Sequence, residues 1–242
     1  MLWIVLFVLF FIAVNVINPF FVKAQANGPC VKSLVLKMAA ATGYLITGLL
    51  AMKIGENYSK FAWLLFIALV LCWIGDLFLH LWQSKVFYGI GFLGFLSGHF
   101  AFIAAFLTKI GELDPSRGFF SVPEVAGVAL FCLFFILFSA KIGTNIKGVI
   151  AVPLLVYAVV ITTMLCKATV MGVAYAASGA SNGVFAAVVA ILGALLFVVS
   201  DFSIAILMFN EKHKKNLKLK MFNMVTYFLA VLLLSALPAL IK

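Results

Sequence analysis

The feature that most constrains this chain is a series of eight apolar runs, most of them close to 20 residues long, separated by short polar segments. A helix rises about 1.5 Å per residue, so about 20 residues cross about 30 Å of hydrocarbon. The runs lack the in-out alternation of barrel strands, which favours helices. They predict an all-α, polytopic membrane bundle forming a single transmembrane domain over residues 1–242, with spans at 2–21, 33–52, 61–82, 86–107, 125–140, 148–175, 184–208 and 221–241.

The composition excludes the soluble and disulfide-rich classes. Hydrophobic residues make up 66% of the chain and charged residues 10%, whereas about 25% of a soluble domain is charged. The four cysteines show neither a CxxC spacing nor a His-rich partner motif, so we expect small apolar side chains and no metal site or cofactor. They are Cys30, Cys72, Cys132 and Cys166.

The first apolar run has a second interpretation, as a signal peptide. Ala24, Gln25 and Ala26 resemble a small-residue cleavage site. However, no Lys or Arg precedes the run, and the run is longer than the 7–15 residues or so of a signal core. We therefore expect a membrane span.

The loop charges predict the orientation of the chain. Ten lysines follow the first, third, fifth and seventh spans, against six Lys and Arg residues, Lys109 and Lys167 among them, on the other side. The richer side should be cytoplasmic, which places both termini on the non-cytoplasmic side of a bacterial inner membrane. Half of these ten lysines lie within residues 212–220, which indicates contact with anionic membrane lipid rather than with nucleic acid.

A few polar side chains fall inside the predicted spans, where an ionisable group is expensive and usually faces a cavity or a partner. Counting from the span ends places three of them in one layer, roughly 6–11 Å deep: Lys37, Asp76 and Asp201. The same half of the bilayer holds further candidates, with His99 nearer the midplane. These are Asn15, His80, Tyr157, Asn223 and Tyr227.

Each candidate also has a structural interpretation. Lys37 would snorkel to the interface, His80 would be an interfacial residue, and His99 a satisfied buried histidine. Asp76 and Asp201 would join helices through Lys or Asn partners.

The two aspartates stand in similar motifs. Residues 71–79 (LCWIGDLFL) resemble residues 196–204 (LFVVSDFSI), and the two spans run in the same direction. This echo predicts a parallel repeat of four plus four helices.

Two carboxyl groups in one apolar layer favour one protonated and one ionised group, that is, an acid and a base. Lys37 would hold Asp76 ionised, so we expect Asp201 to be the acid. With three histidines and no HExxH motif, zinc hydrolases lack support. The layer fits a lipid substrate with an acid-labile bond, and equally a proton-coupled transporter.

Four segments in order carry a family resemblance: residues 73–79 (WIGDLFL), 95–106 (FLSGHFAFIAAF), 153–157 (PLLVY) and 193–201 (GALLFVVSD). Together they resemble the lysoplasmalogenase (YhhN-like) family of integral membrane proteins, from about Lys37 to Tyr227. The resemblance implies an eight-helix enzyme, a hydrolase acting on ether bonds. Its reaction cleaves the vinyl ether bond of lysoplasmalogen and releases a fatty aldehyde and glycerophosphoethanolamine or glycerophosphocholine.

The resemblance also assigns roles to residues. Asp76 and Asp201 match the family's two essential aspartates, while Lys37 and His99 match its lysine and histidine. We add Asn15, His80, Tyr157 and Tyr227 as supporting or substrate-binding residues. Two positions depart from the family pattern. The family often has tyrosine where this chain has Phe102, and glutamine where it has Val231. These departures leave the exact substrate open.

Two further functions stay open from the sequence. A transporter would need polar residues that continue from the aspartate layer to the opposite face of the membrane. Beyond the middle of the bilayer the sequence offers only His99, Thr162 and Thr163. A non-catalytic lysolipid-binding protein would bind the same ligand without turnover. The expected partners are therefore a lysophospholipid and membrane lipid.

Overall fold

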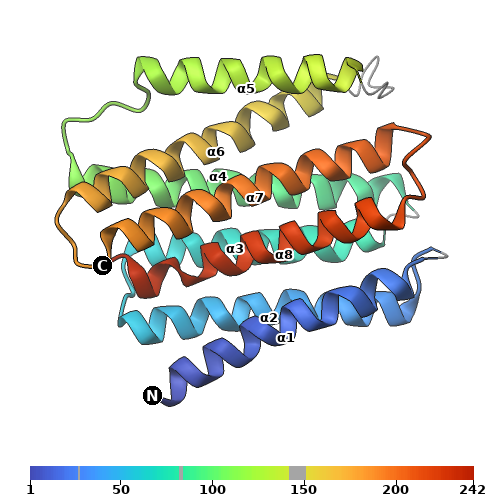
Figure 1. Cartoon of the computed structure of the whole chain (residues 1–242), viewed down its shortest axis with the longest axis horizontal. Helices are drawn as coiled ribbons and strands as arrows, with labels where there is room; N and C mark the ends of the chain where they lie inside the picture. The colour runs from blue at the N-terminus through green and yellow to red at the C-terminus, as the bar shows by residue number, and fades with distance from the viewer. Residues whose placement is uncertain (27, 82–83, 142–150) are drawn as a thin grey trace.

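The computed structural model describes residues 1–26, 28–81, 84–141 and 151–242. These residues form helices and no strand (Figure 1), and eight of the helices are long and apolar enough to cross a membrane. The all-α fold class is thereby confirmed. The helices are α1 (Leu2–Ala24), α2 (Val31–Gly55), α3 (Lys60–His80), α4 (Lys85–Leu113), α5 (Val122–Lys141), α6 (Ala151–Ala177), α7 (Gly183–Phe209) and α8 (Leu217–Leu240).

The helices follow the predicted spans, and most extend them by a few residues. The fifth helix begins at Val122 rather than at residue 125, so it includes Glu124. The sixth ends at Ala177, shortly before Gly179, whose φ of 83° ends a helix easily. The predicted positions 82 and 148–150 lie outside the described residues.

Local signals fix where the helices start. Cys30 and Ser33 form a reciprocal capping box at the start of α2, in which each side chain accepts a hydrogen bond from the backbone N–H of the other. Ser59 caps α3 and Asn216 caps α8 by single hydrogen bonds, in which their side chains accept from the backbone N–H of Ala62 and Leu219. These polar caps separate the apolar runs, because they satisfy N–H groups that have no partner within the helix.

Six of the helices form a closed ring. Following the contacts around it, α2 packs on α3, α3 on α4, α4 on α6, α6 on α7, α7 on α8, and α8 on α2. Helix α1 packs outside this ring on α2 and α8, and α5 packs outside it on α6. Buried residues make up 17% of the apolar window of α1 and 6% of that of α5, against 39% or more in each ring helix.

The second half of the ring repeats the contacts of the first. The pairs α1–α2, α2–α3 and α3–α4 have counterparts in α5–α6, α6–α7 and α7–α8. The two pairs that close the ring, α4–α6 and α8–α2, correspond in the same way. Among the described residues, the contacts of α8 with α1 and α3 have no counterparts of this kind in α4 with α5 and α7, so the repeat of four plus four helices stays a prediction.

Small residues bring α3 close to α4. A Cβ atom on Gly75 would lie 2.6 Å from the ring of Phe95, and one on Gly94 would lie 3.0 Å from the backbone nitrogen of Gly75. Only glycine permits this approach, as in other membrane helix pairs. The contact holds α3, which carries Asp76 directly after Gly75, close against α4.

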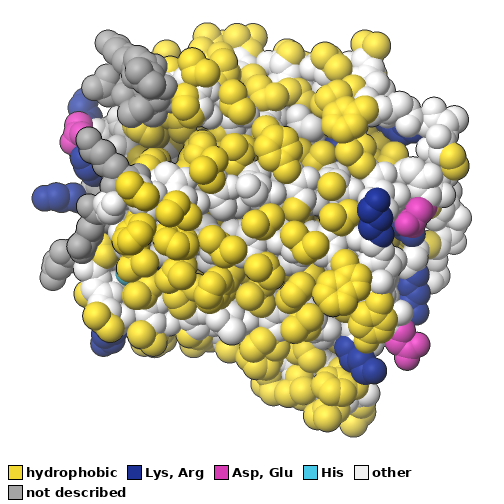
Figure 2. All heavy atoms as spheres, turned by 180° about the vertical axis from the view of Figure 1, so that it is seen from behind, with side chains coloured by type: hydrophobic (Ala, Val, Ile, Leu, Met, Phe, Trp, Pro, Cys, Tyr) yellow, Lys and Arg dark blue, Asp and Glu magenta, His cyan; other side chains and the backbone are white. Residues whose placement is uncertain are grey.

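The surface has the distribution expected of a membrane protein. Hydrophobic side chains cover the middle of the face seen in Figure 2, and the charged ones gather at the two ends of the helices. Both chain termini lie at the same end of the bundle (Figure 1). With eight helices able to span a bilayer, the chain is an integral, multi-pass membrane protein.

The placement of Lys167 in a loop is wrong, because it lies inside α6 and is 1% exposed. Its Nζ is 2.6 Å from Oε1 of Glu124 on α5, a buried ion pair that lets the charge remain among apolar helices. Lys109 likewise lies within α4, where its Nζ bonds to Glu112 at 2.9 Å and to the carbonyl of Lys242 at 2.7 Å. Lys147, counted on the richer side, lies outside the described residues.

Candidate functional site

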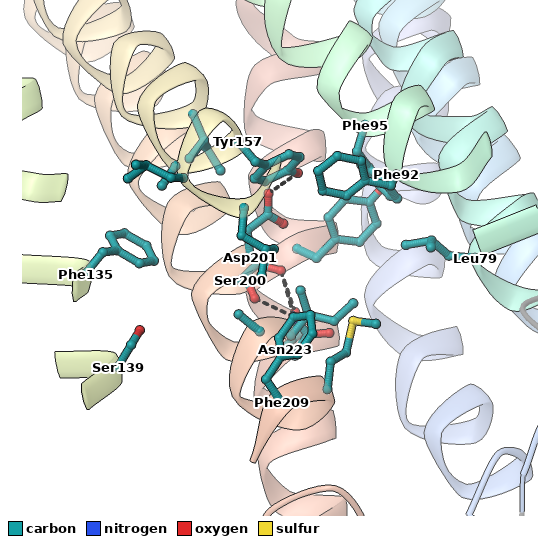
Figure 3. Close-up of a pocket in the computed structure, with 18 of the residues that line it drawn as sticks. Leu79, Phe92, Phe95, Phe135, Ser139, Tyr157, Ser200, Asp201, Phe209 and Asn223 are labelled. Atoms are coloured by element: carbon teal, nitrogen blue, oxygen red, sulfur yellow. Dashed lines mark hydrogen bonds between the residues drawn. The ribbon is translucent and has the colours of Figure 1, made fainter. Parts of the chain in front are cut away.

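A cavity of about 790 Å³ is lined by the six ring helices and by α5, and its volume lies within the range of roughly 300–1,000 Å³ found for small-molecule sites. Apolar side chains form most of its wall, and Asp201, Ser200 and Asn223 face it from α7 and α8 (Figure 3). It brings together six of the residues proposed from the sequence: Lys37, Asp76, Tyr157, Asp201, Asn223 and Tyr227.

Asp76 lies on α3 within a complete set of donors. Lys37 of α2 places its Nζ 3.0 Å from Oδ1. The hydroxyls of Tyr227 and Tyr44 donate to Oδ2 over 2.5 and 3.1 Å. Asp76 is 1% exposed. One cation and two hydroxyl donors match the needs of an ionised carboxylate.

Lys37 points into the bundle and does not snorkel. Lys37 is 7% exposed, and its Nζ also donates to the backbone carbonyl of Asp76 over 3.0 Å. The charge is therefore satisfied by α3, which makes Lys37 a link between two ring helices as well as the counter-ion of Asp76.

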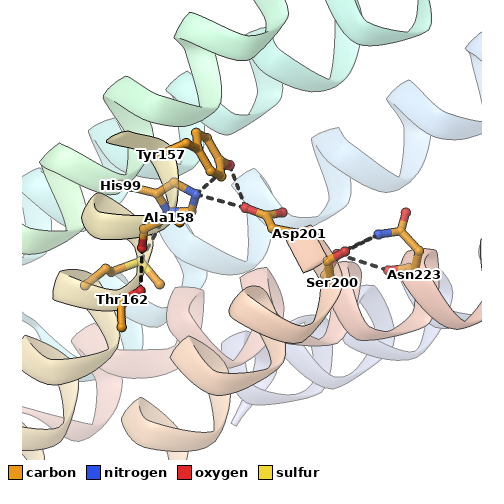
Figure 4. A network of polar contacts seen from close by, with 8 residues as sticks. His99, Tyr157, Ala158, Thr162, Ser200, Asp201 and Asn223 are labelled. Atoms are coloured by element: carbon orange, nitrogen blue, oxygen red, sulfur yellow. Dashed lines mark hydrogen bonds and ion pairs between the residues drawn. The ribbon is translucent and has the colours of Figure 1, made fainter. Parts of the chain in front are cut away.

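Asp201 lies on α7 and has a sparser set of partners (Figure 4). The hydroxyl of Tyr157 donates to Oδ2 over 2.5 Å, and Nε2 of His99 lies 3.2 Å from the same oxygen and 2.9 Å from that hydroxyl. No described residue forms a hydrogen bond with Oδ1 of Asp201. With its side chain 14% exposed, that oxygen is available to the contents of the cavity.

His99 is fully buried, at 0% exposure, and does not line the cavity itself. Its Nδ1 lies 3.3 Å from Sδ of Met164, so the ring is held from both sides. His99 thus acts on the cavity through Tyr157 and Asp201.

Aromatic side chains separate the residues that contact Asp76 from those that contact Asp201. The ring of Phe197 lies 4.7 Å from that of His99 and 5.5 Å from that of Tyr227. Phe102 packs in turn on Phe197, with centroids 6.2 Å apart. This wall keeps the two sets of donors separate while both aspartates line one cavity.

Phe102 and Val231, the two departures from the family pattern, are each 0% exposed in the core. Neither is among the residues that line the cavity. Both positions therefore lie in the core away from the cavity surface, and their effect on the substrate stays a prediction.

Two other proposed residues lie away from the cavity. Nε2 of His80 is 3.0 Å from the hydroxyl of Ser33 at the start of α2. Asn15, on the outer helix α1, donates to the carbonyl of Phe11 over 2.8 Å. Their contacts are those of structural residues.

Two residues of the site were not among the proposed ones. Tyr44 stands seven residues after Lys37, two turns along the same face of α2, a spacing that relates it to Asp76. Ser200 lines the cavity and accepts from Nδ2 of Asn223 at its carbonyl, over 2.7 Å, and at its hydroxyl, over 3.0 Å. Among the described residues, no group of three His, Cys, Asp or Glu side chains is placed to hold a metal ion.

The sequence matches the YhhN family over residues 32–237, most of the chain. The chain belongs to the YhhN family. This family includes lysoplasmalogenase, and the match confirms the resemblance carried by the four motifs. Searches of curated proteins and of solved structures find no match.

The YhhN match coincides with the ring. It contains the six ring helices almost entirely, together with α5, and it leaves out α1. Both aspartates and their partners from α2, α4, α6 and α8 therefore lie in the part of the chain that defines the YhhN family.

Proposed function

We propose that this YhhN protein is a membrane-embedded lysoplasmalogenase. It hydrolyses the vinyl ether bond of lysoplasmalogen and releases a fatty aldehyde and glycerophosphoethanolamine or glycerophosphocholine, with no cofactor. The observation that carries the proposal is that two aspartates line one mostly apolar cavity. Asp76 is paired with a lysine, whereas Asp201 has one carboxyl oxygen without a hydrogen-bond partner among the described residues.

Asp201 supplies the first proton. Its Oδ2 is held by Tyr157 and His99, which leaves Oδ1 directed to the cavity. The carboxyl proton passes to the β-carbon of the vinyl ether, and the double-bond electrons form the new C–H bond. The carbon next to the ether oxygen becomes part of an oxocarbenium ion, which the carboxylate then stabilises in a medium of low dielectric constant.

Asp76 takes the proton of the attacking water. Because Asp76 is 1% exposed, Tyr227, which lines the cavity and donates to Oδ2, passes its proton to Asp76 as it accepts one from water. The oxygen of water bonds to the cationic carbon and gives a hemiacetal.

Collapse of the hemiacetal restores both residues. The proton held at Asp76 returns through Tyr227 to the departing glycerol oxygen, and the C–O bond breaks. The hemiacetal hydroxyl gives its proton to Asp201, so an aldehyde and an alcohol form with no net change in the protein.

The core beyond the aspartates supports an enzyme over a transporter. Phe102, Phe106 and Phe197 fill this region and are each 0% exposed, whereas alternating access needs a polar path to the opposite face. The cavity instead extends to Met208, Phe209 and Ala151, at helix ends that precede or follow the lysine-rich loops. We therefore propose a bacterial inner membrane, termini on the non-cytoplasmic side and substrate drawn from the cytoplasmic leaflet.

The test uses purified full-length protein in lipid nanodiscs. It is given lysoplasmalogen or the matching lysolipid with a saturated ether, in heavy water, and the aldehyde is trapped and analysed by mass spectrometry. We expect aldehyde from lysoplasmalogen alone, with deuterium on the carbon beside the aldehyde group. Asp76→Asn and Asp201→Asn proteins, checked for folding, should release little. Equal release by folded variants, or none by the wild type, overturns the proposal.

A further inference from the structure

One face of α5 borders the cavity. Cys132, Phe135, Ile136 and Ser139 line the cavity, at the spacing of a single helix face. Figure 3 shows Phe135 and Ser139 on the α5 side of the cavity, apart from the ring helices. Buried residues make up 6% of the apolar window of this helix, so its inner face meets open space.

The opposite wall of this space is apolar and partly small. Leu154 and Ala158 contribute from α6, and Ile204 and Ala205 from α7. Ile204 and Ala205 lie three and four residues after Asp201, on the same face of α7. The space among α5, α6 and α7, which we call the α5 seam, is therefore an apolar arm of the cavity that begins at Asp201.

Helix α5 is fixed firmly near its start. Oε1 of Glu124 lies 2.6 Å from Nζ of Lys167, and Oε2 lies 3.8 Å from the guanidinium of Arg117. The Lys167 ammonium also lies 4.6 Å from the ring centroid of Phe120 and bonds to the carbonyl of Phe119. This buried network anchors the end of α5 that is remote from the cavity.

Nearer its other end, α5 meets α7 through aromatic contacts. The ring of Phe202 lies 4.6 Å from that of Phe135 and 5.0 Å from that of Phe138. Phe202 directly follows Asp201, so this contact joins α5 to α7 beside the start of the seam. Aromatic contacts exchange readily for contacts with a hydrocarbon chain, whereas the Glu124–Lys167 pair does not.

We propose that the α5 seam is the binding site for the single hydrocarbon chain of a lysophospholipid, which reaches it sideways from the bilayer past Phe202. The apolar wall, the position among membrane-spanning helices and the continuity with Asp201 all fit a chain whose first carbons reach the carboxyl. The polar wall formed by Lys37, Ser200 and Asn223 is then left for the glycerol and head group. The vinyl ether chemistry rests on the proposed function, but binding of the chain does not.

Cys132 provides a native reporter of occupancy. Replacing the exposed Cys30 and the half-buried Cys166 by serine leaves Cys132 and the fully buried Cys72. A saturated-ether lysolipid at ten times its dissociation constant should slow N-ethylmaleimide labelling of Cys132 about tenfold, as read by peptide mass spectrometry. Glycerophosphoethanolamine, which has the head group and no chain, should not protect. Equal labelling with and without lysolipid overturns the chain site.

A second experiment fills the seam. Ala205→Trp should lower hydrolysis of a hexadecenyl substrate about tenfold or more relative to an octenyl one. Val188→Trp, on the lipid-exposed face of the same helix, is the matched control. Ile136→Trp, at a position 53% exposed, provides a second seam variant if Ala205→Trp does not fold. An unchanged chain preference in the folded seam variants also overturns the chain site.

The two proposals fail separately. If the wild type releases no aldehyde while lysolipid still protects Cys132, the reaction is wrong and the chain site stands. If the wild type hydrolyses lysoplasmalogen while Cys132 labels freely, the chain lies elsewhere and the reaction stands.

Discussion

The two aspartates of the cavity stand in similar motifs and occupy different environments. Asp76 has a lysine and two tyrosine hydroxyls around it, and its side chain is 2% exposed. Asp201 has a tyrosine and a histidine on one oxygen only, and its side chain is 14% exposed. The difference comes from the neighbouring helices, because a carboxylate takes its chemical character from its partners more than from its own helix.

The packing places these partners in corresponding positions. Lys37 comes from α2 and Tyr157 from α6, the helices that precede the two aspartate helices in each half. Tyr227 reaches Asp76 from α8, and His99 reaches Asp201 from α4, in each case from the helix that follows the aspartate helix of the other half. A repeat that began with equal sites would thus have one site with a cation and one without, which separates a base from an acid.

The largest effect should come from Asp201. Asp201→Asn keeps the shape and the contact with Tyr157 but has no proton acid enough to transfer, so turnover should fall by about 10²–10⁴-fold. Aldehyde release in nanodiscs measures it, and the thermal unfolding midpoint should stay near that of the wild type. A folded variant at the wild-type rate would contradict the role of Asp201.

The next largest effect should be on the free energy of unfolding, and it tests whether Asp76 depends on its lysine partner. Lys37→Met leaves the buried carboxylate without its cation, which should cost about 3–5 kcal/mol. Asp76→Asn added to Lys37→Met should restore much of that loss, since it removes the uncompensated charge. Denaturant titration in detergent gives the three free energies. Additive losses would mean that the two residues do not form a pair.

A smaller effect compares tyrosines. Tyr157→Phe removes one of two donors from Asp201, and a hydrogen bond to a charged group contributes about 1.5–3 kcal/mol, so turnover should fall roughly ten- to hundredfold. Tyr44→Phe removes the longest of three contacts at Asp76 and should cost only a few-fold, because Lys37 and Tyr227 remain. A larger loss in Tyr44→Phe would reverse the comparison.

The smallest effect should come from α1, outside the ring. Asn15 bonds to its own helix, so Asn15→Ala should change the free energy of unfolding by no more than about 0.5 kcal/mol. Aldehyde release should equal that of the wild type. A marked loss of activity would show that α1 takes part in the site.

The sequence by itself determined the eight spans, the membrane setting and the polar layer. Hydropathy is a local property, and about 20 apolar residues in a row have few alternatives to a spanning helix. The scarcity of charge also made Lys37, Asp76 and Asp201 stand out as a site. Their common place on one cavity depended on the packing, because Lys37 and Asp76 lie on adjacent ring helices whereas Asp201 lies on α7, across the ring from α3.

Only the tertiary structure decided which groups meet. Tyr227 reaches Asp76 across 151 positions of the chain, and His99 reaches Asp201 across 102. The Glu124–Lys167 pair joins α5 to α6, although the count of loop charges included that lysine. Helix packing sets these contacts through glycine approaches and aromatic fits, and a local pattern of hydropathy carries no information about such distant surfaces.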